Sequence, residues 1–163
     1  MQRDSVIFLC TGNICRSPMG EGLLKHAIAG LDDSSPLKKL RVLSAGVYGE
    51  DGMRATDNAV VALKKVGVDI SDHVAQTLTS DMLKSCFALF AMTRSHLQSV
   101  MYDFPKEVLP PHMMTLLTLV PGAKSVDIMD PYGYGLRTYM DVRDEIVSAI
   151  PYAIKFLERE LAK

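Results

Sequence analysis

The chain of 163 residues lacks tryptophan, has only three cysteines and carries almost no net charge. Cysteines this sparse and odd in number do not build the disulfide framework of a small secreted domain. A formal charge of −1 gives no overall attraction to nucleic acid or to an anionic membrane. No apolar run is long enough to span a bilayer, and the first residues show no signal-peptide pattern. We therefore expect a cytoplasmic protein that binds neither nucleic acid nor membranes.

The residues that are present suit one globular unit. Hydrophobic residues make up 48% and charged residues 23%, as in ordinary domains with a real core. A chain of this length typically folds as one domain, and we find no repeats, linkers or low-complexity tracts. Residues 1–163 are therefore predicted to form a single domain.

Hydrophobic periodicity predicts strands and helices in alternation. The expected strands are residues 5–10, 40–44, 86–92 and 114–120. The expected helices are residues 18–30, 55–66, a short one opening at Thr79, 95–102 and 137–161, the last with a break or kink at Pro151. This order predicts an α/β fold, a three-layer sandwich in which helices cover both faces of a four-stranded parallel sheet. Ligands of such folds bind at the carboxyl ends of the strands.

One such strand end carries the most informative segment, residues 10–17, which read Cys-Thr-Gly-Asn-Ile-Cys-Arg-Ser. A loop curling through Gly12 and Asn13 can aim backbone N–H groups inward and form an anion-binding nest, with Asn13 in the left-handed region. The following helix and the planar guanidinium of Arg16 add donors for an oxyanion. Cys10 at the floor of this bowl is then expected to be a nucleophilic thiolate. A Cys-x5-Arg pattern alone would be weak, because cysteine often ends a buried strand as a small apolar residue.

A second segment supplies the proton that cleavage of a phosphoester needs. Asp130 follows apolar residues and precedes Pro131, and the loop after it contains Gly133 and Gly135. By itself this segment is more typical of a turn, but beside Cys10 it predicts a general acid. We expect Cys10 to attack phosphorus while Asp130 protonates the leaving group, followed by hydrolysis of the phosphocysteine. This chemistry needs no metal or other cofactor, and the four histidines show no metal-ligand spacing.

The two segments together resemble a known family. Residues 10–18, Cys-Thr-Gly-Asn-Ile-Cys-Arg-Ser-Pro, are similar to the phosphate-binding loop of the low-molecular-weight protein tyrosine phosphatases. Residues 130–133, Asp-Pro-Tyr-Gly, are similar to the general-acid loop of that family and occur in the same order along the chain. The resemblance implies the phosphocysteine mechanism, a phosphorylated protein as substrate and inorganic phosphate as product. It also implies a phosphate-binding loop made of Thr11, Gly12, Asn13, Ile14, Cys15 and Ser17 around the catalytic Cys10 and Arg16.

The resemblance also implies supporting roles around the loop. In the family, a serine at the position of Ser17 donates a hydrogen bond to the nucleophile, here Cys10. The residues alone also allow Ser17 to cap the following helix. A serine and a histidine hold the family's loop asparagine, and Ser44 and His73 stand at the matching places for Asn13. A solvated His73 in a turn is the other interpretation.

The remaining cysteines have different expected roles. In the family, a second cysteine at the position of Cys15 can form a reversible disulfide with the nucleophile and protect it from over-oxidation. Cys86 lies inside the apolar run 86–92 and is expected to be inert core.

The substrate class depends on the pocket walls. Tyr132, and Tyr48 in the Gly-rich loop 46–53, are expected to form aromatic walls that favour phosphotyrosine. Tyrosine-specific members of the family usually carry two adjacent aromatic residues after Asp-Pro, whereas this chain has Gly133. This layout, with Tyr139 and residues 143–145 downstream, also resembles protein arginine phosphatases. Those members carry a threonine where this chain has Ile14, which favours phosphotyrosine and keeps phosphoarginine as the alternative.

Two further classes fit less well. Arsenate reductases of the same fold relay electrons through extra cysteines near residues 80–90, where only Cys86 is present. A non-catalytic phosphoprotein-binding module would be expected to lose Cys10 or Asp130, and both are present. The oligomeric state is left open by the sequence.

Overall fold

The computed structural model describes residues 2–163 and places a four-stranded parallel sheet at the centre of the protein. The spatial order is β2-β1-β3-β4, and all neighbouring strands run parallel, with one register shift between β1 and β3 at Ser5 and Val6. The strands are β1 (Ser5–Cys10), β2 (Arg41–Gly46), β3 (Cys86–Ala91) and β4 (His112–Thr115). Each of the six residues of β1 is buried, as expected for a strand with neighbours on both sides and helices on both faces.

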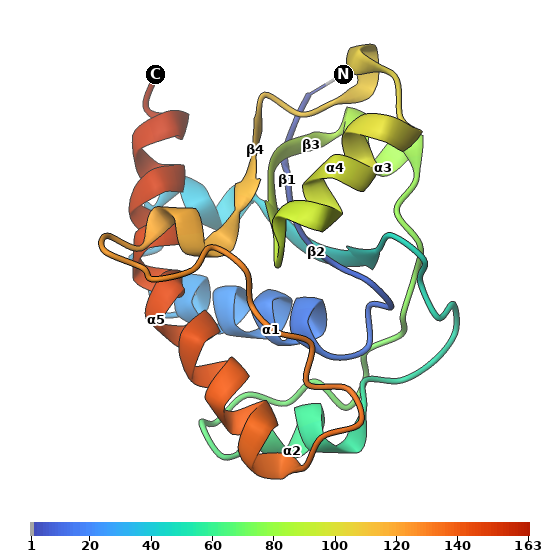
Figure 1. Cartoon of the computed structure of the whole chain (residues 1–163). Coiled ribbons are helices and arrows are strands. Elements are labelled where there is room, and N and C mark those ends of the chain that lie inside the picture. The colour runs from blue at the N-terminus through green and yellow to red at the C-terminus, as the bar shows by residue number, and fades with distance from the viewer. Residues whose placement is uncertain (1) are drawn as a thin grey trace.

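Helices cover both faces of this sheet (Figure 1). The helices are α1 (Arg16–Ala29), α2 (Asp57–Lys64), α3 (Ser80–Lys84), α4 (Arg94–Asp103) and α5 (Leu136–Leu161). Side chains alternate along β1, so Val6 and Phe8 pack in the core under α1, α2 and α5. Ile7 and Leu9 pack in the second core, under α3 and α4. The predicted three-layer α/β sandwich is confirmed.

The predicted strand 114–120 is wrong. β4 covers only His112–Thr115, and Leu116–Leu119 forms a 3-10 helix. The ladder with β3 ends at the pair Ala91 and Thr115, so the next residues have no partner strand. Their backbone groups close local turns instead, and Leu116 and Leu117 are buried in the core with α5. An apolar run of this length does not by itself distinguish strand from helix.

Of the predicted break or kink at Pro151, the break is wrong, and the kink stays a prediction. α5 is continuous from Leu136 to Leu161 with Pro151 inside it. Pro151 lies at an exposed position, while Ala149, Ile150 and Ala153 around it are buried. Packing of this buried face holds the helix together across the proline. No helix in residues 2–163 is both long and apolar enough to cross a membrane.

Candidate active site

The loop between β1 and α1 is held by hydrogen bonds to its carbonyl oxygens. The N–H groups of Val47, Tyr48, Glu50 and Thr56 donate to the carbonyls of residues 10, 11, 12 and 14, at 2.9 to 3.0 Å. His73 Nε2 donates to the carbonyl of Asn13 at 2.7 Å. Because C=O and N–H of one peptide unit point in opposite directions, this arrangement turns loop N–H groups towards the opposite side. That side is the pocket, where an anion would meet them.

The close approach of this loop to β2 depends on a missing side chain. A Cβ atom at Gly46 would lie 2.5 Å from the carbonyl oxygen of Thr11 and 3.0 Å from the carbonyl carbon of Gly12. The N–H of Gly46 also donates a hydrogen bond to the carbonyl of Gln76 at 2.9 Å, which holds the segment around Gln76 beside the end of β2. The glycine therefore lets the end of β2 support the loop directly.

Asn13 is the buried centre of a polar network behind the loop. Its φ is +61°, the left-handed conformation expected from the sequence. Its Nδ2 donates to Ser17 Oγ at 2.8 Å and to Ser44 Oγ at 2.9 Å, and its Oδ1 accepts from the N–H of Gln76 at 2.9 Å. Ser44 Oγ in turn donates to Glu21 Oε1 at 2.6 Å. The structure thus brings Ser44 and His73 onto Asn13 and adds Glu21 and Gln76, which the sequence did not identify.

Cys10 lies at the floor of the pocket, almost fully buried, with its Sγ 2.8 Å from Ser17 Oγ. Asn13 donates to the same hydroxyl, so the one Ser17 hydrogen can be donated to the Cys10 sulfur at 2.8 Å or to the Ala45 carbonyl at 3.5 Å, and the shorter contact is with the sulfur. Ser17 is not the helix cap: α1 begins at Arg16, its N-cap is Cys15, and no side chain caps it. Because α1 starts two residues earlier than predicted, Ser17 lies within its first turn, and its hydroxyl contacts the Cys10 sulfur in place of capping the helix.

Arg16, the first residue of α1, lines the pocket and carries one donor without a partner. Its side chain is buried, and Nη1 donates to the carbonyl of Ile128 at 2.8 Å. Nη2 lies 3.5 Å from Thr11 Oγ1 and 3.7 Å from Asp130 Oδ2. Nε is buried without a hydrogen-bond partner, the one such side-chain atom found in residues 2–163. An unpartnered buried donor is costly, and a bound oxyanion would satisfy it.

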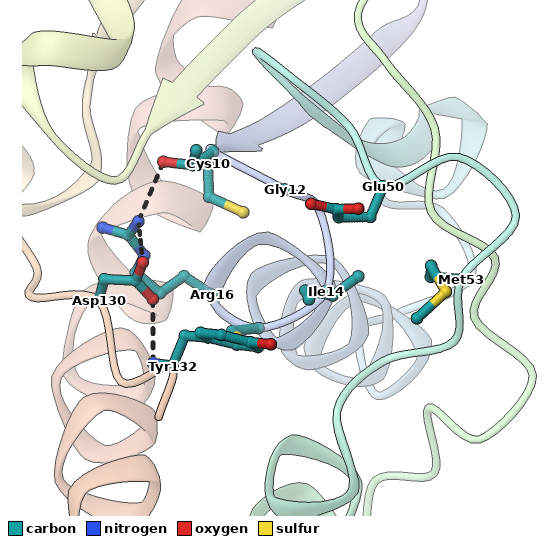
Figure 2. Close-up of a pocket in the computed structure, with 10 residues that line it drawn as sticks. Cys10, Gly12, Ile14, Arg16, Glu50, Met53, Asp130 and Tyr132 are labelled. Carbon is teal, nitrogen blue, oxygen red and sulfur yellow. Dashed lines mark hydrogen bonds and ion pairs between the residues drawn. The ribbon is translucent and has the colours of Figure 1, made fainter. Parts of the chain in front are cut away.

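The pocket above Cys10 has a volume of about 300 Å³. Figure 2 shows Arg16, Asp130 and Tyr132 on one side and Glu50 and Met53 on the other. The lining residues are Cys10, Thr11, Gly12, Ile14, Cys15, Arg16, Glu50, Met53, Asp130 and Tyr132. Asp130 Oδ1 accepts a hydrogen bond from the N–H of Tyr132 at 3.1 Å, which orients the carboxyl group at the start of its loop.

The expected second aromatic wall is wrong. The Tyr48 side chain is 72% exposed and is not among the residues that line the pocket. The chain turns at residues 47–48, between the closely packed Gly46 and Gly49, and this turn leaves Tyr48 in solvent. Glu50 and Met53 from the same loop form the wall instead.

The other two cysteines are buried. Cys15 Sγ lies 3.3 Å from Tyr139 Oη and 3.6 Å from Thr56 Oγ1. Burial raises the pKa of the Cys15 thiol, and burial also raises the pKa of Tyr139 to about 12, so both groups are neutral near pH 7. Cys86 is fully buried in β3, and burial raises its pKa to about 12, as suits inert core.

Comparison with known proteins identifies the family. Residues 5–163, nearly the whole chain, match the family described as low molecular weight phosphotyrosine protein phosphatase. The chain belongs to this family. As a low-molecular-weight phosphatase, it is an enzyme whose fold agrees with that of solved relatives.

Its relatives include proteins of two specificities. A protein-arginine-phosphatase of Bacillus subtilis (strain 168) is 34% identical over 155 residues, which is 95% of this chain and 97% of the relative. The YwlE arginine phosphatase of Geobacillus stearothermophilus superposes with a TM-score of 0.80 at 31% identity, covering 96% and 94% of the two chains. A low molecular weight protein tyrosine phosphatase from T. tengcongensis superposes with a TM-score of 0.79 at 35% identity, covering 93% and 98%.

Sequence reasoning missed several residues of this phosphatase site. Glu50 and Met53 lie in a loop whose path depends on its contacts with the phosphate-binding loop, so the sequence alone does not place them. His96 lies 3.0 Å from Thr11 Oγ1, although 85 residues separate the two. The one sequence signal for His96 is its place three residues after Thr93, the spacing of a capping box.

Proposed function

We propose that the protein removes phosphoryl groups from phosphoproteins through a phosphocysteine. The observation that carries this proposal is the buried Cys10 in a pocket that is also lined by Arg16, whose Nε has no hydrogen-bond partner, and by Asp130. The Cys10 thiolate attacks phosphorus, the S–P bond forms, and the bond from phosphorus to the leaving group breaks as Asp130 gives that group its proton. Water then attacks phosphorus, Asp130 takes a proton from the water, and the S–P bond breaks to release inorganic phosphate.

The loop provides the electrostatic part of this reaction. Its inward N–H groups and Arg16 bind the oxygens of the phosphoryl group, whose charge is spread over them in the transition state. Arg16 is fixed in advance by Ile128, and the loop is fixed by Asn13 and its partners. These donors therefore need little rearrangement when the substrate binds.

Phosphotyrosine is the substrate we favour. Ile14, a residue of the phosphate-binding loop, lines the pocket with an apolar side chain, and the ring of Tyr132 lines it as well. A phenyl ring can pack between such surfaces while its phosphate reaches Cys10. The relative from T. tengcongensis, a protein tyrosine phosphatase, supports this choice.

Phosphoarginine is the second candidate, and Glu50 is the observation that favours it. Two carboxyl groups, Glu50 and Asp130, line opposite sides of the pocket. A phosphorylated guanidinium carries N–H donors that carboxylates bind well. The relative from Bacillus subtilis, a protein-arginine-phosphatase, supports this candidate along nearly the whole chain.

The two candidates are separated by measuring kcat/KM on matched peptides that carry phosphotyrosine or phosphoarginine at one position. We expect the native protein to be faster on phosphotyrosine. Ile14→Thr should lower kcat/KM for phosphotyrosine by about tenfold, because it replaces apolar contact with the ring by a hydroxyl. A native protein that prefers phosphoarginine would refute the first candidate and support the second.

Glu50→Gln tests the other side of the pocket. We expect it to raise kcat/KM for phosphotyrosine peptides by about threefold at low salt, because a carboxylate near the mouth repels a phosphate dianion. The matched control is Asp51→Asn, which removes the same charge at the next residue. The Asp51 side chain accepts a hydrogen bond from Thr77 and does not line the pocket. A loss of phosphoarginine activity above about tenfold in Glu50→Gln alone would instead show that Glu50 binds the guanidinium.

A further inference from the structure

A buried histidine lies directly beside the phosphate-binding loop. His96 is 6% exposed and stands in the first turn of α4, where it completes a capping box with Thr93. Its backbone N–H donates to Thr93 Oγ1 at 3.3 Å, and its ring Nδ1 lies 3.2 Å from the N–H of Thr93. Its other ring nitrogen, Nε2, lies 3.0 Å from Thr11 Oγ1. The ring therefore joins the start of α4 to the residue that follows Cys10.

The direction of both ring hydrogen bonds is determined. A backbone N–H can only donate, so Nδ1 of His96 must be the accepting nitrogen and Nε2 must carry the hydrogen. Burial, with a smaller contribution from the charge of Arg16, lowers the pKa of His96 to about 4. The imidazole is thus neutral near pH 7, in the one tautomer that donates from Nε2 to Thr11.

The hydrogen bond from His96 Nε2 determines whether the Thr11 hydroxyl accepts or donates at its other positions. Its oxygen faces two donors, His96 Nε2 at 3.0 Å and Arg16 Nη2 at 3.5 Å. A hydroxyl has two lone pairs and one hydrogen, so with both lone pairs engaged its hydrogen is left to be donated elsewhere. Thr11 lines the pocket, and the Arg16 nitrogen that it faces also faces Asp130. The hydroxyl hydrogen of Thr11 is therefore not used by His96 or Arg16, and it belongs to a residue that lines the pocket.

We propose that His96 is a positioning residue that fixes the Thr11 hydroxyl as a hydrogen-bond donor to the phosphoryl group in the transition state. This inference rests on the proposed phosphatase function. The Thr11 hydroxyl then adds to the loop N–H groups and Arg16 one more donor fixed before the substrate arrives. His96 itself touches neither the substrate nor Cys10 and acts through Thr11.

The test uses two pairs of variants, with p-nitrophenyl phosphate as substrate and orthovanadate as inhibitor. His96→Asn keeps a carbonyl that can accept from the Thr93 N–H but is too short to reach Thr11, whereas His96→Gln can present an amide N–H to Thr11. Thr11→Val removes the hydroxyl, and Thr11→Ser keeps it. We expect His96→Asn and Thr11→Val each to lower kcat/KM and to weaken orthovanadate inhibition by about tenfold. His96→Gln and Thr11→Ser should each lose less than about threefold.

The double variant His96→Asn/Thr11→Val separates this role from a structural one. If His96 acts through Thr11, the double variant should be no slower than the single variants, because both remove the same donor. Additive losses, or a His96→Asn protein as active as native, would overturn the inference. If thermal unfolding shows that His96→Asn is not folded, the comparison of Thr11→Val with Thr11→Ser still decides whether the Thr11 hydroxyl contributes. Equal rates for these two variants would overturn the inference. An inactive native protein would refute the proposed function instead.

Discussion

Cys10→Ser should lower kcat/KM for p-nitrophenyl phosphate by at least about ten-thousand-fold, the effect expected when a nucleophile is lost. Cys10 is buried and lines the pocket, its sulfur lies 2.8 Å from Ser17 Oγ, and α1 begins six residues later at Arg16. A serine hydroxyl in the same place does not ionise near neutral pH, so it presents no anion to phosphorus. The measurement is steady-state hydrolysis with thermal unfolding recorded alongside.

Cys86→Ala is the matched control for that experiment. Cys86 pairs with Ser5, at the opposite end of the central strands from Cys10, and is fully buried. Its loss should cost some stability through a small cavity and leave kcat/KM within about twofold of the native value. Activity retained by Cys10→Ser and lost by Cys86→Ala would contradict the assignment of the nucleophile.

Asp130→Asn should lower kcat/KM for a phosphotyrosine peptide by about a hundred- to a thousand-fold, because the leaving tyrosine oxygen then receives no proton. The loss on p-nitrophenyl phosphate should be about tenfold smaller, since nitrophenolate leaves readily without protonation. Asn can still accept the hydrogen bond from the Tyr132 N–H, so the loop geometry should be kept. Comparing the two substrates therefore reports proton transfer separately from binding.

Asp141→Asn provides the control for charge. Asp141 lies on α5 in an exposed ion pair with Arg137 and is not among the pocket residues. Surface pairs of this kind contribute little, so we expect unchanged rates on both substrates. Equal losses on both substrates in Asp130→Asn would show that this carboxyl group binds or orients the substrate and does not act as the acid.

The parts of the fold that could be predicted are those whose signal is local. The run before Cys10 is apolar at every position, and a strand buried on both faces needs that pattern. The run at residues 114–120 is also largely apolar, interrupted by Thr115 and Thr118, yet it ends as a 3-10 helix because β3 offers no partner beyond Ala91. Pairing of this kind depends on the neighbouring strand, so the sequence of the run does not determine it.

The sequence by itself determined which residues the loop brings together. Cys10, Asn13 and Arg16 are close along the chain, so a strand, a left-handed turn and a helix start place them together through local geometry. Only the tertiary structure decided the walls and supports of the pocket. It placed Glu50 in the wall and left Tyr48 in solvent, and it brought His96 to Thr11. Contacts between residues distant in sequence depend on how whole layers pack, which no short stretch of sequence specifies.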